Sequence, residues 1–420
     1  MSKNILVFPC GSEIGLAIYR SLKYSIHFKL YGASSIDDHG RFVYENHISG
    51  MPFVNDDNFI DALNKIIDEN NIDLVFPAHD SVVLKCAQNA GKLHCKVLAS
   101  DAQVCEIARS KLKTYNLLQN TIRTPKIFSI NCISEYPVFL KPDVGQGSKG
   151  CVKANTREEV EIALRKDKSL LILEYLPGKE YTIDCFSDEK GELQYIQGRQ
   201  RARILNGISA NSFPVNDERF VMWAKKISQV VNFKGVWFFQ VKEDKKGDLC
   251  LMEIAPRIAG TMEINRMQGV NLPLMWCFSA LGYPVSILKN GYNIEIDRAL
   301  ANTFKLDINY DTIYVDFDDC LVTNGVVNYK IVAFLYKSFN QGKKIILLTK
   351  HAKNIKSSLR EVKLFEIFDK IIHIKQTDEK YKYIDDCKSI FIDDSFAERK
   401  LVNQILGIPV FAPDMIDSLI

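Results

Sequence analysis

The stretch VFLKPDVGQGSKG, residues 138–150, joins an apolar strand to a glycine-rich loop. Glycine lets the backbone approach phosphate oxygens and turn its N–H groups toward them, and a lysine at the strand end adds a compact positive charge. We therefore predict a polyphosphate-binding loop, although such a turn between two strands is also typical of an ordinary hairpin. The predicted contacts are Lys141, Gly145, Gly147, Ser148 and Gly150.

The composition of the chain favours a soluble protein that handles small molecules. Its 420 residues are enough for two or three domains, and 47% of them are apolar. Lys and Arg number 54 against 51 Asp and Glu, so no strong net charge favours nucleic acid or a membrane as a partner. The eleven cysteines form no C-x-x-C pair, which indicates reduced thiols without disulfides or a zinc knuckle. The first residues, MSKNILVFPCG, are too short an apolar run for a secretory signal, so we expect a cytoplasmic protein.

The first hundred residues alternate between strands and helices. Residues 5–8, 74–77 and 96–99 are apolar runs of strand length, and 16–22 is a helical segment. Alternation of this kind predicts a parallel sheet flanked by helices, with ligands at the carboxyl ends of the strands. The turn Gly11-x-x-x-Gly15 lacks the full dinucleotide fingerprint, so NAD is a weak candidate.

The rest of the chain divides near residues 307–311. After a helix over 110–119, short strands at 170–175, 181–186, 236–241 and 249–254 predict an α+β region. Polar turn residues follow at 307–311, and from Thr312 a new strand, helix, strand order runs to the last residue. We place a domain boundary there.

Four segments in fixed order resemble the ATP-grasp superfamily of carboxylate ligases over about the first three hundred residues. They are the loop at 138–150, then ILEYLPGKEYTID at 172–184, GVWFFQV at 235–241 and LMEIAPR at 251–257. The resemblance implies ATP and Mg²⁺ as cofactors, with Mn²⁺ as the alternative ion. It also implies that a carboxylate attacks ATP to form an acyl phosphate, which an amine then converts to an amide.

The resemblance assigns a role to each matching side chain. Magnesium prefers oxygen ligands and bridges the phosphates, and an arginine stabilises the transferred phosphoryl group. Singly, these residues could equally be solvated side chains on loops and strand edges. The implied roles are adenine contact by Glu174, Tyr175 and Leu176, ribose contact by Glu180, phosphate contact by Lys111 and Lys141, metal binding by Gln240 and Glu253, and phosphoryl stabilisation by Arg257.

Two features of this region leave questions open. The family commonly has asparagine two residues after the metal-binding glutamate, but this chain has Ala255. A water or Asn265 could replace that ligand, or the metal site could be weakened. Arg199, Arg201 and Arg203 alternate along one strand face and, with Arg266, are candidates to bind the acceptor carboxylate; a solvated basic face is the alternative.

Three segments of the last 110 residues place polar side chains at the ends of apolar strands. TIYVDFDDC places Asp316 and Asp318 after one strand, IILLTK ends in Thr349, and SIFIDDS ends in Asp393 and Asp394. These segments resemble the haloacid dehalogenase (HAD) superfamily of phosphatases. Helix caps and turns are the alternative, because aspartate is frequent in both.

This second resemblance also implies residue roles. Asp316 would be the nucleophile that forms an aspartyl phosphate, and Asp318 the general acid. Thr349 would bind phosphoryl oxygens, and Lys380, or alternatively Lys375, would offset the negative charge. Magnesium would be held by Asp316, Asp393 and Asp394.

We therefore expect an α/β and α+β multidomain protein that is a bifunctional enzyme. Residues 1–105 would be a Rossmann-like pre-ATP-grasp domain, 106–306 an ATP-grasp ligase domain, and 310–420 a HAD-like phosphatase domain without a large cap. The partners would be a small carboxylate, an amine and a phosphorylated metabolite, and association of the chain with itself is left open. Rival readings are a kinase of the same fold, a nucleotide-binding regulator and a scaffold.

Overall fold

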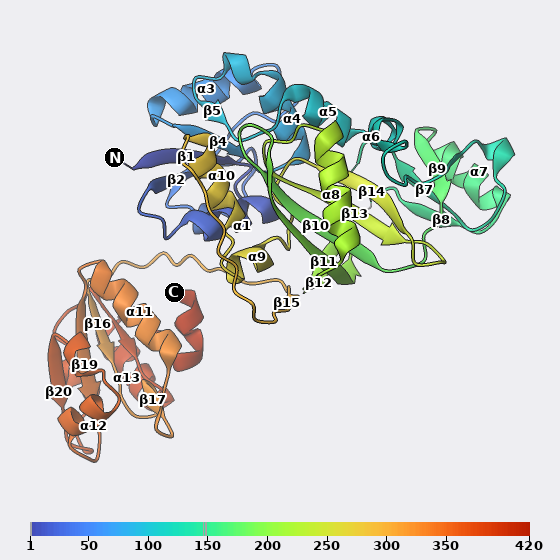
Figure 1. The fold of residues 1–420 in the computed structure, drawn as a ribbon. Coiled ribbons are helices and arrows are strands. Elements are labelled where there is room, and N and C mark those ends of the chain that lie inside the picture. Colours follow the sequence, from blue (N-terminus) through green and yellow to red (C-terminus); the bar gives the residue numbers. More distant parts are fainter. Residues whose placement is uncertain (1, 146, 148) are drawn as a thin grey trace. The chain divides into compact units, whose positions relative to one another are not determined.

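The computed structural model describes residues 2–145, 147 and 149–420, so Ser148 of the glycine-rich loop lies outside the described residues. The chain is mixed α/β and divides into two compact units, Met1–Leu300 and Ala301–Ile420 (Figure 1). The division precedes the predicted boundary at 307–311 because residues 298–310 are extended and carry no helix or strand. Among the described helices, none has the length and apolar character needed to span a bilayer.

The first sheet is parallel, as the alternating pattern predicts, in the order β3-β2-β1-β4-β5. In β1 the side chains of Ile5 and Val7 enter one core and those of Leu6 and Phe8 the other, because successive strand residues point to opposite faces. The strands are β1 (Lys3–Phe8), β2 (Phe28–Ala33), β3 (Asn46–Ile48), β4 (Leu74–Pro77) and β5 (Lys96–Val97).

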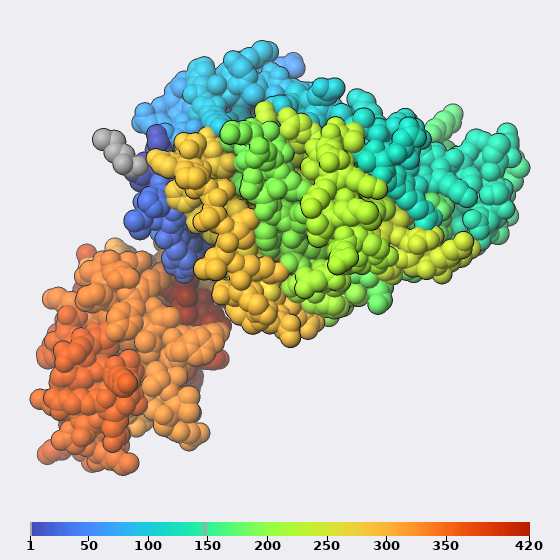
Figure 2. Space-filling model, in the orientation of Figure 1, coloured from blue at the N-terminus to red at the C-terminus, as the bar shows by residue number. Residues whose placement is uncertain are grey.

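Helices cover both faces of this sheet. The apolar side chains of α3 share a core with Leu6 and Phe8, while α1 and α10 share a core with Ile5 and Val7. Figure 2 shows the yellow-orange segment that contains α10 against the blue N-terminal residues. The helices between residues 13 and 118, together with α9 and α10, have the following bounds: α1 (Glu13–Leu22), α2 (Gly40–Val43), α3 (Phe59–Glu69), α4 (Asp80–Gln88), α5 (Ala102–Arg109), α6 (Lys111–Leu118), α9 (Glu263–Met267) and α10 (Leu272–Ala280).

A small antiparallel sheet in the order β6-β9-β7-β8 carries the glycine-rich loop. The loop joins β7 to β8, which pair antiparallel, so it is a long hairpin connection. Helix α7 (Arg157–Lys166) packs its buried Val160 and Ala163 against the same core. The strands are β6 (Ile127–Phe128), β7 (Val138–Pro142), β8 (Val152–Ala154) and β9 (Leu170–Glu174).

The largest sheet has six antiparallel strands in the order β14-β13-β10-β11-β12-β15. Helix α8 (Glu218–Val230) contacts β10 and β11 through Phe220, Trp223 and Ile227, which are buried at helical spacing. The strands are β10 (Glu180–Ser187), β11 (Leu193–Leu205), β12 (Ile208–Val215), β13 (Gly235–Glu243), β14 (Leu249–Ala255) and β15 (Ile296–Asp297).

The unit of residues 301–420 is built on a parallel sheet in the order β20-β19-β16-β21-β22. A two-stranded hairpin, β17 (Val322–Thr323) with β18 (Val326–Val327), follows β16. The other elements are β16 (Thr312–Val315), β19 (Lys344–Thr349), β20 (Lys370–His373), β21 (Ser389–Ile392), β22 (Val410–Phe411), α11 (Tyr329–Asn340), α12 (Ile355–Glu361) and α13 (Phe396–Leu406).

Candidate functional site

Adjoining pockets line the region of residues 1–300 where the large sheet, the small sheet and the N-terminal sheet meet. The first two, of about 270 and 240 Å³, share Arg201, Gln240 and Glu253. The second shares Lys141 and Met252 with a third, smaller pocket. The sequence motifs that lie far apart along the chain therefore line neighbouring spaces.

The smallest pocket is mostly apolar and is lined by Tyr115, Leu173 and the predicted adenine segment Glu174, Tyr175 and Leu176. The carboxylate of Glu174 points to the backbone, accepting a hydrogen bond from the N–H of Lys126 at 3.1 Å. It also pairs with Arg123 at 3.2 Å. A mostly apolar slot suits a flat aromatic ring.

Two lysines belong to the second pocket. Lys141 is 6% exposed and its ammonium group donates to the carbonyl of Met252 at 3.1 Å. Burial lowers the pKa of Lys141 to about 8, although the nearby Glu253 acts in the opposite direction. Lys111 donates to the carbonyl of Asp143 at 3.1 Å. Both side chains are thus held beside the glycine-rich loop.

The described glycines of the loop have the conformations that the sequence pattern requires. Gly147 and Gly150 have φ values of 62° and 74°, a region that residues with a side chain rarely adopt. Gly145 and Gly147 line the same pocket as the two lysines. The backbone of the loop can therefore face a ligand closely.

Gln240 and Glu253 are opposite one another on β13 and β14. Cross-strand partners in an antiparallel sheet point to the same face, so these oxygens can serve one magnesium ion. Ala255 is buried and supplies no ligand. Asn265 does not replace it, because it is fully buried elsewhere and is bonded to Asp184 at 2.9 Å. The suggestion that Asn265 compensates is therefore wrong.

Arg201 lies between the predicted ribose and metal contacts rather than apart from them. It pairs with the carboxylate of Glu180 and donates to Oε1 of Gln240 at 3.1 Å. Lys242 is 3.6 Å from the same carboxylate. Arg201 lines both larger pockets, so its side chain lies where the two pockets meet.

The other three arginines that were predicted to bind the acceptor are each paired with a carboxylate of the protein. Arg199 is 2% exposed and forms a buried ion pair with Asp184 at 2.8 Å, so its charge is already neutralised at the wall of the first pocket. Arg203 is half exposed and pairs with Asp297. Arg266 pairs with Glu263 within α9 and lines none of the pockets described here. A contact between Arg266 and the acceptor finds no support in this geometry.

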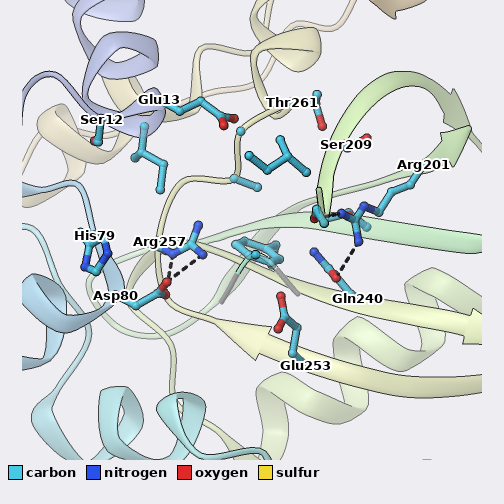
Figure 3. Close-up of a pocket in the computed structure, with 18 of the residues that line it drawn as sticks. Ser12, Glu13, His79, Asp80, Arg201, Ser209, Gln240, Glu253, Arg257 and Thr261 are labelled. Atoms are coloured by element: carbon cyan, nitrogen blue, oxygen red, sulfur yellow. Dashed lines mark hydrogen bonds and ion pairs between the residues drawn. The ribbon is translucent and has the colours of Figure 1, made fainter. Parts of the chain in front are cut away.

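Sequence reasoning missed several residues of the first pocket. Figure 3 labels Ser12 and Glu13, at the start of α1 after β1, and His79 and Asp80, at the start of α4 after β4. Burial alone raises the pKa of Asp80, but the guanidinium of Arg257 outweighs it and holds that pKa below its usual value. The sequence did carry one indication of these pocket residues: they follow the carboxyl ends of predicted strands, where a parallel sheet usually binds its ligand. Thr261 and Arg298 also line this pocket.

A second cluster lies in the unit of residues 301–420. The ammonium group of Lys380 is 2.8 Å from Asp316 and 2.6 Å from Asp393, and all three side chains are buried. Thr349, at the end of β19, is fully buried. Of the two candidate lysines, the structure brings Lys380 to the carboxylates.

Three carboxylates that could hold a metal ion also lie there. Carboxylate oxygens of Asp316, Asp393 and Asp394 lie within 4.8 Å of one another. Burial raises the pKa of Asp316, and it raises the pKa of Asp393 to about 6. Burial opposes the charge of Lys380, but the two carboxylates outweigh it and raise its pKa. Two buried carboxylates against one ammonium leave an excess negative charge that suits a divalent cation.

Asp318 has a partner that the sequence did not reveal. His351 Nδ1 lies 2.8 Å from a carboxylate oxygen of Asp318, and its Nε2 lies 2.8 Å from Oγ of Ser358. Asp318 itself is about half exposed. The predicted general acid therefore faces solvent and is oriented by a histidine.

Residues 166–302 match the family described as ATP-grasp in the biosynthetic pathway with Ter operon. This part of the chain is therefore similar to an ATP-grasp domain. ATP and Mg²⁺ are the cofactors of ATP-grasp ligases, and the pocket residues described above fit both. The match begins at residue 166 and ends at residue 302, so residues 1–165 and the last 118 residues lie outside it.

Known relatives of the ATP-grasp domain are ligases and carboxylases. A D-alanine–D-alanine ligase of Fusobacterium nucleatum is 27% identical in an alignment of 214 positions that covers 46% of this chain and 73% of that protein. The structure of an L-amino acid ligase from Bacillus licheniformis has a TM-score of 0.54 at 19% identity, covering 67% of this chain and 74% of that one. A Hydrogenobacter thermophilus biotin carboxylase domain, a dimer solved with MgADP, has a TM-score of 0.58 at 15% identity over 69% and 72% of the two chains.

Proposed function

We propose that residues 1–306 form an ATP- and Mg²⁺-dependent ligase that joins a carboxylate to an amine through an acyl phosphate. Residues 1–105 would be its Rossmann-like N-terminal domain and 106–306 its ATP-grasp domain. The substrate class would be amino acids, because two of the similar proteins are named as amino-acid ligases.

One observation carries this proposal: a slot for a flat ring, a lysine-lined loop and an acceptor pocket adjoin one another in that order. Arg201, Gln240 and Glu253 line both of the larger pockets. A γ-phosphate held there with magnesium would lie between the nucleotide and the acceptor carboxylate. Such positioning lowers the barrier by presenting reactants in line.

The groups of the acceptor pocket support a carboxylate substrate. Arg201, which also pairs with Glu180, offers a guanidinium to a carboxylate, whereas the acidic groups of Glu13 and Asp80 are paired with Arg298 and Arg257. In the reaction, the carboxylate oxygen would attack the γ-phosphorus and ADP would leave. The amine would then attack the acyl carbon, and inorganic phosphate would leave as the amide forms.

We also propose that residues 310–420 form a HAD-like phosphatase that acts on a phosphorylated metabolite of the same pathway. The buried cluster of Asp316, Lys380 and Asp393, with Asp394 beside it, supports this proposal. Asp316 would attack phosphorus to form an aspartyl phosphate. Asp318 would protonate the leaving oxygen and later activate water.

Two alternatives remain for the ATP-grasp domain. A kinase would leave the phosphate on the acceptor instead of releasing it on amide formation. A regulator would bind ATP without turnover, and Ala255, which supplies no metal ligand, is the residue that favours it.

The test is ADP and phosphate release by the full chain with magnesium, across amino acids offered singly and in pairs. The variant Asp316→Asn removes the expected phosphatase background. A ligase releases both products only with a productive pair, and mass spectrometry finds a dipeptide. A phosphorylated acceptor would indicate the kinase, and ATP binding without turnover on any pair would indicate the regulator.

A further inference from the structure

Cys10, Asp38 and His47 come together in the N-terminal unit, and none of the three lines the pockets described above. One possible ligand atom from each lies within 4.8 Å of the others. Cys10 is two residues past β1, Asp38 follows β2, and His47 lies in β3. These strands are neighbours in a parallel sheet, so their carboxyl ends bring the three side chains to one edge.

The backbone around this cluster is shaped to make room for it. A Cβ atom on Gly11 would lie 2.1 Å from Cγ of Asp38, and one on Gly40 would lie 2.2 Å from Sγ of Cys10. Neither glycine has a positive φ, so conformational freedom does not account for them. The absence of side chains at both positions lets the thiol and the carboxylate approach each other.

The hydrogen bonds leave part of the cluster unsatisfied. Ser34 Oγ lies 3.1 Å from the sulfur of Cys10 and donates to Oδ1 of Asp38 at 3.0 Å. The N–H of Gly40 donates to the same oxygen at 2.9 Å. Nε2 of His47 is buried and has no hydrogen-bond partner among the described residues. A buried polar atom without a partner is costly, and a metal ion is one way to satisfy it.

We propose that Cys10, Asp38 and His47 bind a structural Zn²⁺ ion. Zinc takes thiolate, imidazole and carboxylate ligands together, whereas magnesium and calcium prefer oxygen alone. The hydroxyl of Ser34 or a water would complete four ligands. Binding converts the thiol to a thiolate and releases its proton to solvent.

A structural ion fits this position better than a reactive thiol. Cys10 is 0% exposed, so a substrate cannot reach its sulfur. Burial raises the pKa of Cys10 to about 11, so without a cation the thiol keeps its proton at neutral pH and is a poor nucleophile.

The ion would stabilise the loop that serves the acceptor pocket. Ser12 and Glu13, which line that pocket, are two and three residues from Cys10. Ser12 also caps α1 and bonds to the carbonyl of Pro9 at 2.9 Å. A metal bond at Cys10 would hold the start of this short loop to the ends of β2 and β3.

The test is a Co²⁺ titration of the full chain, purified without a histidine tag, stripped with a chelator and kept in excess Mg²⁺ so that the carboxylate cluster of residues 316, 393 and 394 is occupied. We expect one equivalent to produce the thiolate-to-cobalt charge-transfer absorption, and Zn²⁺ to abolish it. Cys10→Ser should remove the absorption. Asp38→Asn and His47→Gln should weaken Co²⁺ binding about tenfold or more.

The matched controls are Cys132→Ser, an exposed thiol, and His94→Gln, an exposed histidine of the same unit. Both should titrate like the unchanged protein. No charge-transfer absorption in the unchanged protein, or full absorption in Cys10→Ser, would overturn the proposal. If circular dichroism shows that Cys10→Ser is unfolded, the test depends on His47→Gln, because His47 is partly exposed. An unchanged Co²⁺ affinity in His47→Gln would then overturn the proposal.

Discussion

Arg257 and Asp80 form a two-point ion pair, with Nε 2.6 Å from Oδ1 and Nη2 3.0 Å from Oδ2. The pair joins a residue two positions past the end of β14 to the first residue of α4, and these two residues are 177 positions apart. The guanidinium also lies 5.2 Å from the ring centre of Phe238. Asp80 therefore orients the arginine that the sequence assigns to the transferred phosphoryl group.

Asp80→Asn should impair ligation more than ATP binding. The variant keeps the size of the side chain but removes the charge that holds Arg257, so we expect kcat to fall about tenfold or more with a small change in the ATP Kd. Asp101→Asn, at an exposed ion pair with Lys234, is the control and should behave like the unchanged protein. Equal losses in both variants would contradict a specific role for Asp80.

ATP binding should take up a proton near pH 8. The pKa of Lys141 is lowered to about 8 by burial, and a bound phosphate favours the charged form and raises it again. Calorimetry in two buffers of different ionisation enthalpy measures the uptake. Lys141→Arg stays charged at this pH and should lose the uptake while still binding ATP, whereas Lys166→Ala, at an exposed position of α7, should keep it. Uptake that persists in Lys141→Arg would assign the proton to another group.

Asp316→Asn should abolish phosphatase turnover and leave the fold intact. The amide has nearly the same shape as the carboxylate but cannot form the aspartyl phosphate. Asp319→Asn is the control, because Asp319 has a φ of 53° and asparagine tolerates that conformation. Hydrolysis of a generic phosphate ester measures both variants. Full activity in Asp316→Asn would refute the assignment of the nucleophile.

Asp393→Asn should stabilise residues 301–420 in the absence of metal. The pKa of Asp393 is raised to about 6, above its unfolded value, so the native state binds more protons between about pH 4 and 6 and stability falls as pH rises through that window. The deficit is complete about one pH unit above the folded pKa and is then on the order of 3 kcal/mol, which a neutral amide or bound magnesium relieves.

Thermal unfolding at pH 7.5 in chelator measures this effect. We expect the variant to melt several degrees higher and to gain little from added Mg²⁺, whereas the unchanged protein gains clearly. Asp414→Asn, at an exposed position, is the control and should keep the response to magnesium. An unchanged magnesium response in Asp393→Asn would exclude this residue as a ligand.

Much of the local structure follows from the sequence. The strand at Leu74–Pro77 has the predicted bounds, β9 ends one residue earlier than predicted, and α6 is one residue shorter than predicted at each end. These elements are buried apolar runs or amphipathic repeats, whose period reports their conformation directly. The strand-end positions of Lys141, Asp316 and Asp393 follow from the same runs.

Contacts between distant segments were decided by tertiary structure. Arg199 lies opposite Thr182 in the register of β10 and β11, which brings it to Asp184 and neutralises it instead of presenting it freely to an acceptor. Likewise, the contact of His351 with Asp318 depends on the parallel pairing of β16 with β19.

The sequence by itself determined the elements and the polar residues at their ends, because periodicity and strand length are local properties of the chain. Only the tertiary structure decided that Asp80 meets Arg257 and that Cys10, Asp38 and His47 share one edge of a sheet. The order and register of strands depend on packing among residues far apart in the sequence, which no local pattern records.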